Sequence, residues 1–174
     1  MATIESETPW HLRGNWAPVQ TELTAENLTV EGSIPPQLEG VYIRTGPNPK
    51  SGFSPHWFMG DGMVHGVRLS RGKAEWYRNR YVQTPNITKT GNGSNPDLGD
   101  LSNGSGNTHV VAHAGTILCL EEGHWPWKID KELNTVSFEN YDGLLTTSMT
   151  AHPKICPKTG ELLAFSYFSF EPPY

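Results

Sequence analysis

Seven histidines are the side chains of this 174-residue chain best suited to bind a metal, because neutral imidazole is a common ligand for iron, zinc and copper. They are His11, His56, His65, His109, His113, His124 and His152. Two arrangements among them could do metal chemistry. One is the closely spaced pair in "HVVAH", and the other is the histidine of "TAHP" with partners elsewhere.

The pair in "HVVAH", His109 and His113, has the i, i+4 spacing that chelates zinc on a helix. Val110 and Val111 favour a strand instead, and the Ala-Gly that follows predicts a turn. On a strand the two imidazoles would lie roughly 13 Å apart, too far to share one ion. The Glu of the zinc-protease motif is also absent. A zinc hydrolase is therefore a minor alternative, which predicts stoichiometric zinc that is lost when either histidine is mutated.

His152 stands before Pro153, and proline restricts the preceding residue to extended backbone, which fixes the direction of the imidazole. In a β-propeller the ends of inner strands converge on the axis, where histidines from separate blades could bind one ion. Such ligands would be far apart in the sequence. From the residues alone, both a surface side chain and a metal ligand stay open for His152.

Two carboxylates, Glu121 and Glu122, end the apolar run "TILCLEE". Adjacent residues of a strand face opposite sides, so we expect one to point inward and the other to solvent, not an acid/base pair. Asp61 lies between two glycines and is interpreted as part of a tight turn. Arg44, before "TGPNP", is interpreted as a structural cation that holds loop carbonyls.

Short strands and tight turns would position these residues, since the chain has 18 Gly and 14 Pro and only 18% charged residues. "MVHGVRLS" and "AEWYRNRYV" predict a hairpin around Arg71-Gly72. Gly72, Gly115 and Gly160 each stand between a polar turn and an alternating strand, 43 and 45 residues apart. A repeat of about 40–45 residues is the length of one four-stranded propeller blade.

The predicted fold class is therefore all-β, a β-propeller of which this chain holds about three blades. We expect one partial propeller domain over residues 1–174, with an extended arm at 1–30 and a flexible loop at 84–107. That loop has almost no apolar residues. Because propellers have about 4–8 blades, we expect the chain to be the amino-terminal part of a longer protein.

The composition excludes several classes of protein. The net charge is −5 without a basic cluster, which argues against nucleic acid as a partner. The first residues lack the pattern of a signal peptide, and no run approaches the roughly 18 apolar residues of a membrane span. Cys119 and Cys156 are expected to be unpaired thiols of a cytoplasmic protein.

Five segments, in order, carry a resemblance to a known family: "LEGVYIRTGPNP", "HWFMGDGMVHGVRL", "NRYVQTP", "GNTHVVAHAGTILCLEEG" and "MTAHPKICPKTGELLAFSY". Together they make residues 15–174 similar to the amino-terminal part of the carotenoid cleavage oxygenases. That family includes apocarotenoid and lignostilbene oxygenases and the isomerase of the retinal pigment epithelium. The resemblance implies a seven-bladed propeller, in agreement with the blade-length repeat.

The resemblance also implies an iron(II) centre on the propeller axis, held by four histidines. His152 matches the first ligand, and the other three ligands would follow the end of this chain. Glu122 matches a carboxylate that hydrogen-bonds an iron-bound imidazole, expected to be one of those missing three. Thr108 matches a small side chain beside an open coordination position. Glu121 has no counterpart and is interpreted as a surface residue.

The implied activity is a dioxygenase reaction, in which Fe²⁺ activates O₂ and one C=C bond of a carotenoid, apocarotenoid or stilbene becomes two carbonyl groups. The partners would be O₂ and an apolar conjugated small molecule. Many relatives carry an apolar, membrane-touching segment where residues 84–107 are polar, which favours a hydroxystilbene over membrane docking through this loop. With one of four ligands, the chain alone is expected to be inactive. The alternative is a propeller remnant that acts as a binding or scaffold module.

Overall fold

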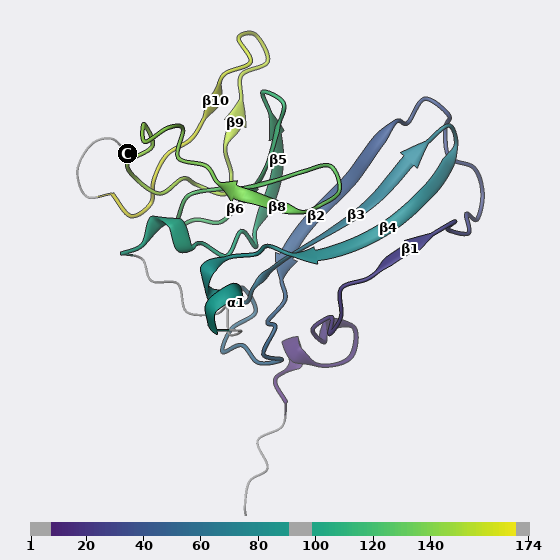
Figure 1. Ribbon diagram of the computed structural model, residues 1–174, viewed down its shortest axis with the longest axis horizontal. Coiled ribbons are helices and arrows are strands. Elements are labelled where there is room, and N and C mark those ends of the chain that lie inside the picture. Colours follow the sequence, from purple (N-terminus) through teal and green to yellow (C-terminus); the bar gives the residue numbers. More distant parts are fainter. Residues whose placement is uncertain (1–7, 91–98, 170–174) are drawn as a thin grey trace, which may run out of the picture.

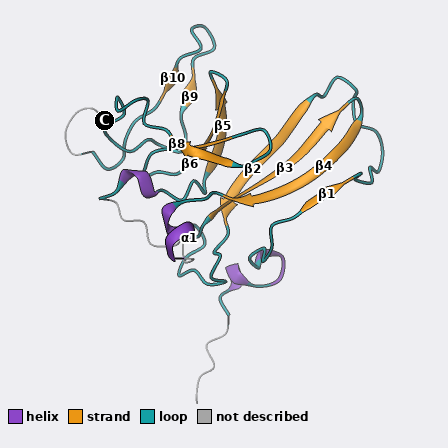
Figure 2. Ribbon diagram, viewed as in Figure 1, coloured by secondary structure: helices purple, strands orange, loops and turns teal. Residues whose placement is uncertain are grey.

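The computed structural model describes residues 8–90 and 99–169, and the regular secondary structure of this part of the chain is mainly antiparallel sheet, joined by long loops (Figures 1 and 2). The first sheet has the order β1-β4-β3-β2, with β1 Thr24–Glu26, β2 Gly40–Pro47, β3 Gly62–Ser70 and β4 Lys73–Tyr81. The second has the order β5-β6-β7-β8, with β5 His109–His113, β6 Thr116–Leu120, β7 Trp127–Ile129 and β8 Thr135–Phe138. A hairpin of β9 Lys154–Ile155 and β10 Leu162–Leu163 follows. Four strands are the size of one propeller blade.

The predicted hairpin of the first sheet is confirmed. β3 and β4 pair from Ser70 opposite Lys73 to Met63 opposite Tyr81. In its tight turn both Arg71 and Gly72 have positive φ, at 48° and 76°, as hairpin turns that follow the twist of the strands require. β2 pairs with the other edge of β3, and it also lies against β5. The β2 edge of the first sheet therefore meets the β5 edge of the second.

The three glycines of the predicted repeat all lie in hairpin turns, with φ of 76°, 79° and 77° at Gly72, Gly115 and Gly160. Their positions in the sheets differ. Counted from β2, the Gly72 turn joins the second and third strands of its sheet, whereas the Gly115 turn joins the first and second strands of its own. The β9–β10 turn that holds Gly160 again joins the first two strands after a sheet change. Only the second spacing therefore joins equivalent positions of two successive sheets.

Two clusters of buried side chains tie the sheets together. The first, between the two large sheets, is formed by Val64, Val82, Cys119, Trp127, Ile129 and Leu133. The second packs Leu118 and Leu120 of β6 against Met149 and Ala151, the segment that leads to His152. Burial raises the pKa of Cys119 to about 12, and both cysteines are free thiols, as expected.

The arm before the first sheet is held by two asparagine side chains. It contains two 3₁₀ turns, η1 Trp10–Leu12 and η2 Gly14–Trp16, and then β1 on the edge of β4. Asn48 accepts from the backbone N–H of Val19 at 2.7 Å and donates to its carbonyl at 3.0 Å. Asn79 accepts from Leu23 N at 2.8 Å and donates to the Thr21 carbonyl at 3.0 Å. Each side-chain amide thus accepts from one backbone N–H of the arm and donates to one backbone carbonyl, as a neighbouring strand would.

Part of the expected loop 84–107 is helical. α1 spans Pro85–Thr90. Thr84 precedes it as the N-terminal cap, since its hydroxyl oxygen accepts from Ile87 N, and proline fits the first helical position. Ile87 packs with Met63 and Tyr81, a tertiary contact that the polar composition conceals. A further 3₁₀ turn is η3 Leu101–Asn103, while residues 91–98 lie outside the described residues. Within residues 8–90 and 99–169, no helix has the length and apolar character to cross a membrane.

Candidate functional site

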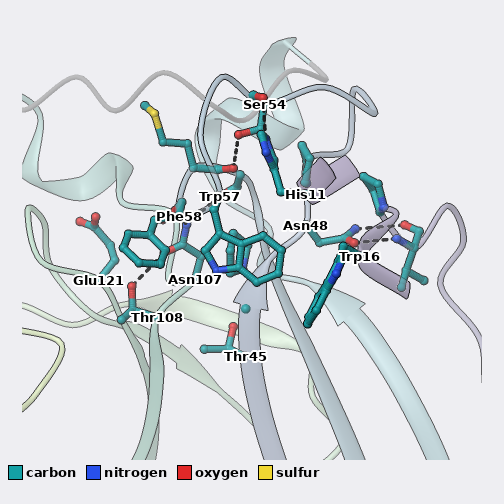
Figure 3. A pocket seen from close by; sticks show the side chains of 18 of the residues that line it. His11, Trp16, Thr45, Asn48, Ser54, Trp57, Phe58, Asn107, Thr108 and Glu121 are labelled. Carbon is teal, nitrogen blue, oxygen red and sulfur yellow. Dashed lines mark hydrogen bonds between the residues drawn. The ribbon is translucent and has the colours of Figure 1, made fainter. Parts of the chain in front are cut away.

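A cavity of about 960 Å³ extends from the arm to the segment that carries His152 (Figure 3). The arm forms one end through η1, η2 and the residues up to Val19. The other end, beside His152, is lined by Thr108, directly before β5, and by Glu121 and Glu122, directly after β6. The residues predicted to do chemistry therefore line one common space.

His152 lies between two buried residues, Ala151 and Pro153, and its own side chain is 60% exposed on the cavity wall. Its backbone N–H donates to Thr150 Oγ1 at 3.1 Å. The buried neighbours hold the backbone while the imidazole stays accessible. An accessible ring on a fixed backbone is compatible with a metal ligand and equally with a surface side chain. The ligand role of His152 therefore stays a prediction.

Glu122 binds both the backbone and the ring of the His152 segment. One carboxylate oxygen, Oε2, accepts from Ala151 N at 2.9 Å, and Oε1 lies 3.1 Å from Nε2 of His152. The resemblance implied that Glu122 orients an imidazole beyond this chain. In the structure its partner is the imidazole that the chain itself contains, because the turn after β6 places the carboxylate directly against residues 150–152.

Thr108 is fixed at the first residue before β5. Its N–H donates to the Leu120 carbonyl at 2.9 Å, and its hydroxyl donates to Asn107 Oδ1 at 3.0 Å. The buried amide of Asn107 in turn donates to the Gly60 carbonyl at 2.8 Å. A small hydroxyl side chain thus stands on the cavity wall in a defined orientation (Figure 3).

Glu121 is not a surface residue, and this expectation was wrong. Its side chain is only 15% exposed, lines the cavity, accepts from Gly123 N at 3.0 Å and pairs with Nδ1 of the fully buried His124. Strand alternation does not apply because β6 ends at Leu120 and the chain then turns. A Cβ at Gly104 would lie 2.6 Å from His124 Cβ, so only glycine lets this loop close over the pair.

The strand predicted for "HVVAH" is confirmed as β5, and its two histidines bind different segments. His109 Nδ1 lies 2.8 Å from the Ala151 carbonyl, and His113 Nε2 lies 2.8 Å from the Gly160 carbonyl. In the part of the chain that the structure describes, no three His, Cys, Asp or Glu side chains are grouped closely enough to hold a metal ion. The zinc hydrolase alternative therefore has no geometric support.

Two other polar residues, Asp61 and Arg44, were interpreted as structural, one in a tight turn and the other holding loop carbonyls. Asp61 stands directly before β3 and outside a hydrogen-bonded turn; its Oδ2 accepts from Lys50 N at 2.8 Å, and burial raises the pKa of the carboxyl group. Arg44 lines the cavity, but it donates no hydrogen bond to a loop carbonyl among the described residues. The carbonyl-holding role is therefore not seen.

Sequence reasoning missed the aromatic wall at the arm end of the cavity. Trp57 stacks on Trp10 with ring centroids 4.9 Å apart and meets Trp16 edge-on at 5.0 Å. Figure 3 shows Trp57 and Phe58 beside Asn107 and Thr108. The signal was the pair of tryptophans in "PWHLRGNW", too many for an arm that serves only as a tether.

The donor chemistry at His152 fits one ligand position of an iron centre. An accessible neutral imidazole suits Fe²⁺, and Glu122 supplies the carboxylate that commonly steadies a metal-bound histidine. A complete ligand set would need further donors from outside residues 8–90 and 99–169. His152 can thus serve as one ligand, and the described residues cannot serve as the whole site.

Comparison with known proteins shows what this chain is similar to. Residues 16–174 match the family model described as retinal pigment epithelial membrane protein. A carotenoid cleavage oxygenase of Mycobacterium tuberculosis is 46% identical over 172 residues, covering 94% of this chain and 34% of the relative. A carotenoid 9,10(9′,10′)-cleavage dioxygenase of Arabidopsis thaliana is 38% identical, covering 98% of this chain and 38% of the relative.

Solved structures agree with these relatives. A lignostilbene dioxygenase of Pseudomonas brassicacearum superposes with a TM-score of 0.78 at 34% identity, covering 92% of this chain and 37% of that one. A cobalt-substituted apocarotenoid oxygenase of Synechocystis superposes with a TM-score of 0.67 at 27% identity, covering 80% of this chain and 34% of that one. The all-β propeller prediction is therefore confirmed, and the chain spans about a third of the length of the relatives it matches. The chain belongs to the retinal pigment epithelial membrane protein family, whose relatives named above are carotenoid cleavage oxygenases and related dioxygenases.

Proposed function

We propose that this chain forms part of an iron(II)-dependent dioxygenase that cleaves one C=C bond of a carotenoid, apocarotenoid or stilbene. The observation that carries the proposal is the meeting of His152, Glu122 and Thr108 on one cavity, in a chain matched over residues 16–174. The relatives named as carotenoid cleavage oxygenase and lignostilbene dioxygenase support the reaction class.

His152 would supply one imidazole ligand, and bound iron(II) would provide the activation of O₂ that converts the C=C bond into two carbonyl groups. Glu122 fixes the ligand segment, since its two oxygens contact Ala151 N and the His152 ring. Thr108 offers a short side chain on the same wall, which leaves room for a small molecule beside the metal.

The cavity supports a conjugated substrate. The rings of Trp16 and Trp57 line its arm end, and that of Phe58 lies beside Thr108; the faces of these rings suit a flat polyene or aryl group. Its other wall carries the amide of Asn103, whose Oδ1 accepts no hydrogen bond among the described residues and can accept one from a substrate hydroxyl group. We propose a substrate that combines both characters, such as a hydroxystilbene or a hydroxylated apocarotenoid.

The test uses the complete protein, purified, loaded with Fe²⁺ and incubated in air with a hydroxystilbene and with an apocarotenoid. We expect aldehyde products in equal amounts from the two halves of one substrate, identified by mass spectrometry, and no product without iron. Tight binding of both compounds without cleavage by the iron-loaded protein would contradict the proposal and favour a non-catalytic binding module.

A further inference from the structure

Ala151, the residue before His152, is held at both of its backbone polar groups. On one side Glu122 Oε2 accepts from Ala151 N at 2.9 Å. On the other side His109 Nδ1 lies 2.8 Å from the Ala151 carbonyl. Because a carbonyl oxygen can only accept, Nδ1 of His109 must carry the proton and donate. Ala151 itself is fully buried, so this clamp fixes the backbone from which the His152 side chain projects.

The rings of the two histidines also face each other. Their centroids are 6.2 Å apart and their planes differ by 22°. His109 is fixed in β5 opposite Leu120, so its ring limits how far the His152 ring can rotate toward the strand. Glu122 lies at the edge of the same ring, at Nε2. The imidazole is thus confined by a carboxylate and by a second imidazole.

We propose that His109 is a positioning residue for His152, acting through the hydrogen bond to the Ala151 carbonyl and through ring contact. The inference deepens the proposed function and rests on it, because His152 is taken to bind the metal. His109 itself donates Nδ1–H to a carbonyl and is not proposed as a ligand. Removing its donor should loosen the Ala151 peptide and spread the orientations of the His152 ring.

The chain offers a matched control on the same strand. His113, four residues along β5, also binds a backbone carbonyl at 2.8 Å, that of Gly160 in the β9–β10 turn. Loss of this bond removes a similar side-chain-to-carbonyl hydrogen bond and leaves the contacts of Ala151 and His152 unchanged. Equal substitutions at the two positions therefore separate positioning of His152 from a general loss of strand contacts.

Two variants separate the two contacts of His109. His109→Asn keeps an N–H at the place of Nδ1 and removes the ring, whereas His109→Phe keeps a ring and removes the donor. His109→Leu removes both and replaces the Phe variant if that one fails to fold. The same changes at His113 are the controls, and circular dichroism and the melting temperature establish that each variant is folded.

The first readout needs no metal. Hydrogen exchange in the metal-free complete protein is followed by mass spectrometry on the peptide that contains residues 148–153. We expect exchange about 3–10-fold faster in His109→Phe, the size expected for one lost hydrogen bond, and little change in His109→Asn or in either His113 variant. Unchanged exchange in His109→Phe would overturn the proposal.

The second readout is Co²⁺, which gives a visible spectrum sensitive to coordination geometry and has replaced the native metal in the Synechocystis relative. We expect His109→Phe to bind Co²⁺ about 10-fold more weakly with an altered spectrum, and His109→Asn to recover most of the affinity. Faster exchange with unchanged Co²⁺ affinity and spectrum would overturn the positioning role while leaving the oxygenase proposal standing. A wild-type protein that binds neither Co²⁺ nor Fe²⁺ would overturn both.

Discussion

The arm end and the His152 end of the cavity are held by the same device and present different chemistry. At each end two polar side chains bind the backbone of a segment that lies outside the strands: Asn48 and Asn79 at the arm, Glu122 and His109 at Ala151. The arm end presents tryptophan rings, whereas the other end presents the accessible imidazole of His152. One end is thus an aromatic wall, and the other is the end that we propose to contribute one ligand to a metal site.

The two ends differ in which part of the molecule their hydrogen bonds make rigid. Asn79 is fully buried, and its amide bonds reach 56 and 58 residues back to the arm. Glu122 and His109 instead act across 29 and 42 residues on the backbone N–H and carbonyl of one residue, Ala151, beside a ring that stays 60% exposed. Both ends depend on contacts between distant segments, but only the second leaves a reactive side chain free to bind.

The largest effect expected is at His152. In the complete protein, His152→Ala should abolish iron binding and cleavage, because no neighbouring donor among the described residues can replace the imidazole. Metal analysis and product formation measure both effects, and His113→Ala is the control that should keep wild-type iron. Normal iron content and turnover in His152→Ala would show that His152 is not an iron ligand.

At the arm end, Asn79→Ala should lower the free energy of unfolding by about 2–4 kcal/mol, since it leaves the N–H of Leu23 and the carbonyl of Thr21 without their partner and opens a void. Urea unfolding measures the change. Asn15→Ala removes an exposed asparagine of the same arm and should have almost no effect. Equal stabilities of the two variants would show that the asparagine clamp is unimportant.

A third prediction concerns the wall between the ends. Burial, with a contribution from Arg44, lowers the pKa of His65 from 6.5 to about 4, and its Nδ1 is bonded to Tyr77 at 2.8 Å. Between these pH values the unfolded chain binds a proton that the folded one does not. Stability should therefore fall by about 3 kcal/mol as the pH drops from above 6.5 to 4.

The measurement for this third prediction is urea unfolding of the wild type and of His65→Gln from pH 8 to pH 4. The wild type should lose more stability than the variant, and the difference should develop below pH 6.5. Parallel pH profiles would show that the buried histidine adds nothing to the pH dependence.

The smallest effect expected is that of Glu122→Gln. The amide keeps one oxygen for Ala151 N but loses the negative charge beside the His152 ring, so iron should be partly retained and activity should fall about 10–100-fold. The steady-state rate at fixed iron content measures it, with Glu26→Gln on the exposed edge of β1 as the control. An activity equal to the wild type would leave the carboxylate with a purely structural role.

Much of the fold follows from local patterns in the sequence. The hairpin around Arg71-Gly72, the turn glycines and the strand in "HVVAH" each depend on a few neighbouring residues, and each is found. Of the two blade-length spacings, only that from Gly115 to Gly160 joins equivalent turns of successive sheets, because a turn glycine does not tell which strands of a sheet it joins. The α1 helix was missed because its support, Ile87 packed on Met63 and Tyr81, is tertiary.

The site was less accessible to sequence reasoning. The segments of Thr108, Glu122 and His152 could be singled out, but not that Glu122 contacts His152 within this chain. The burial of Glu121 depends on where β6 ends and on Gly104, a loop residue that approaches His124. The contact of His109 with Ala151 spans 42 residues, and no local pattern announces it.

The most direct test of the central claim, that His152 binds iron, is a crystal structure of the iron-loaded complete protein with anomalous data at the iron edge. The account predicts an anomalous peak at roughly 2.0–2.2 Å from an imidazole nitrogen of His152, the usual length of a metal–imidazole bond, with Glu122 still bound to Ala151 N. An iron peak elsewhere, with the His152 ring free of metal, would contradict it.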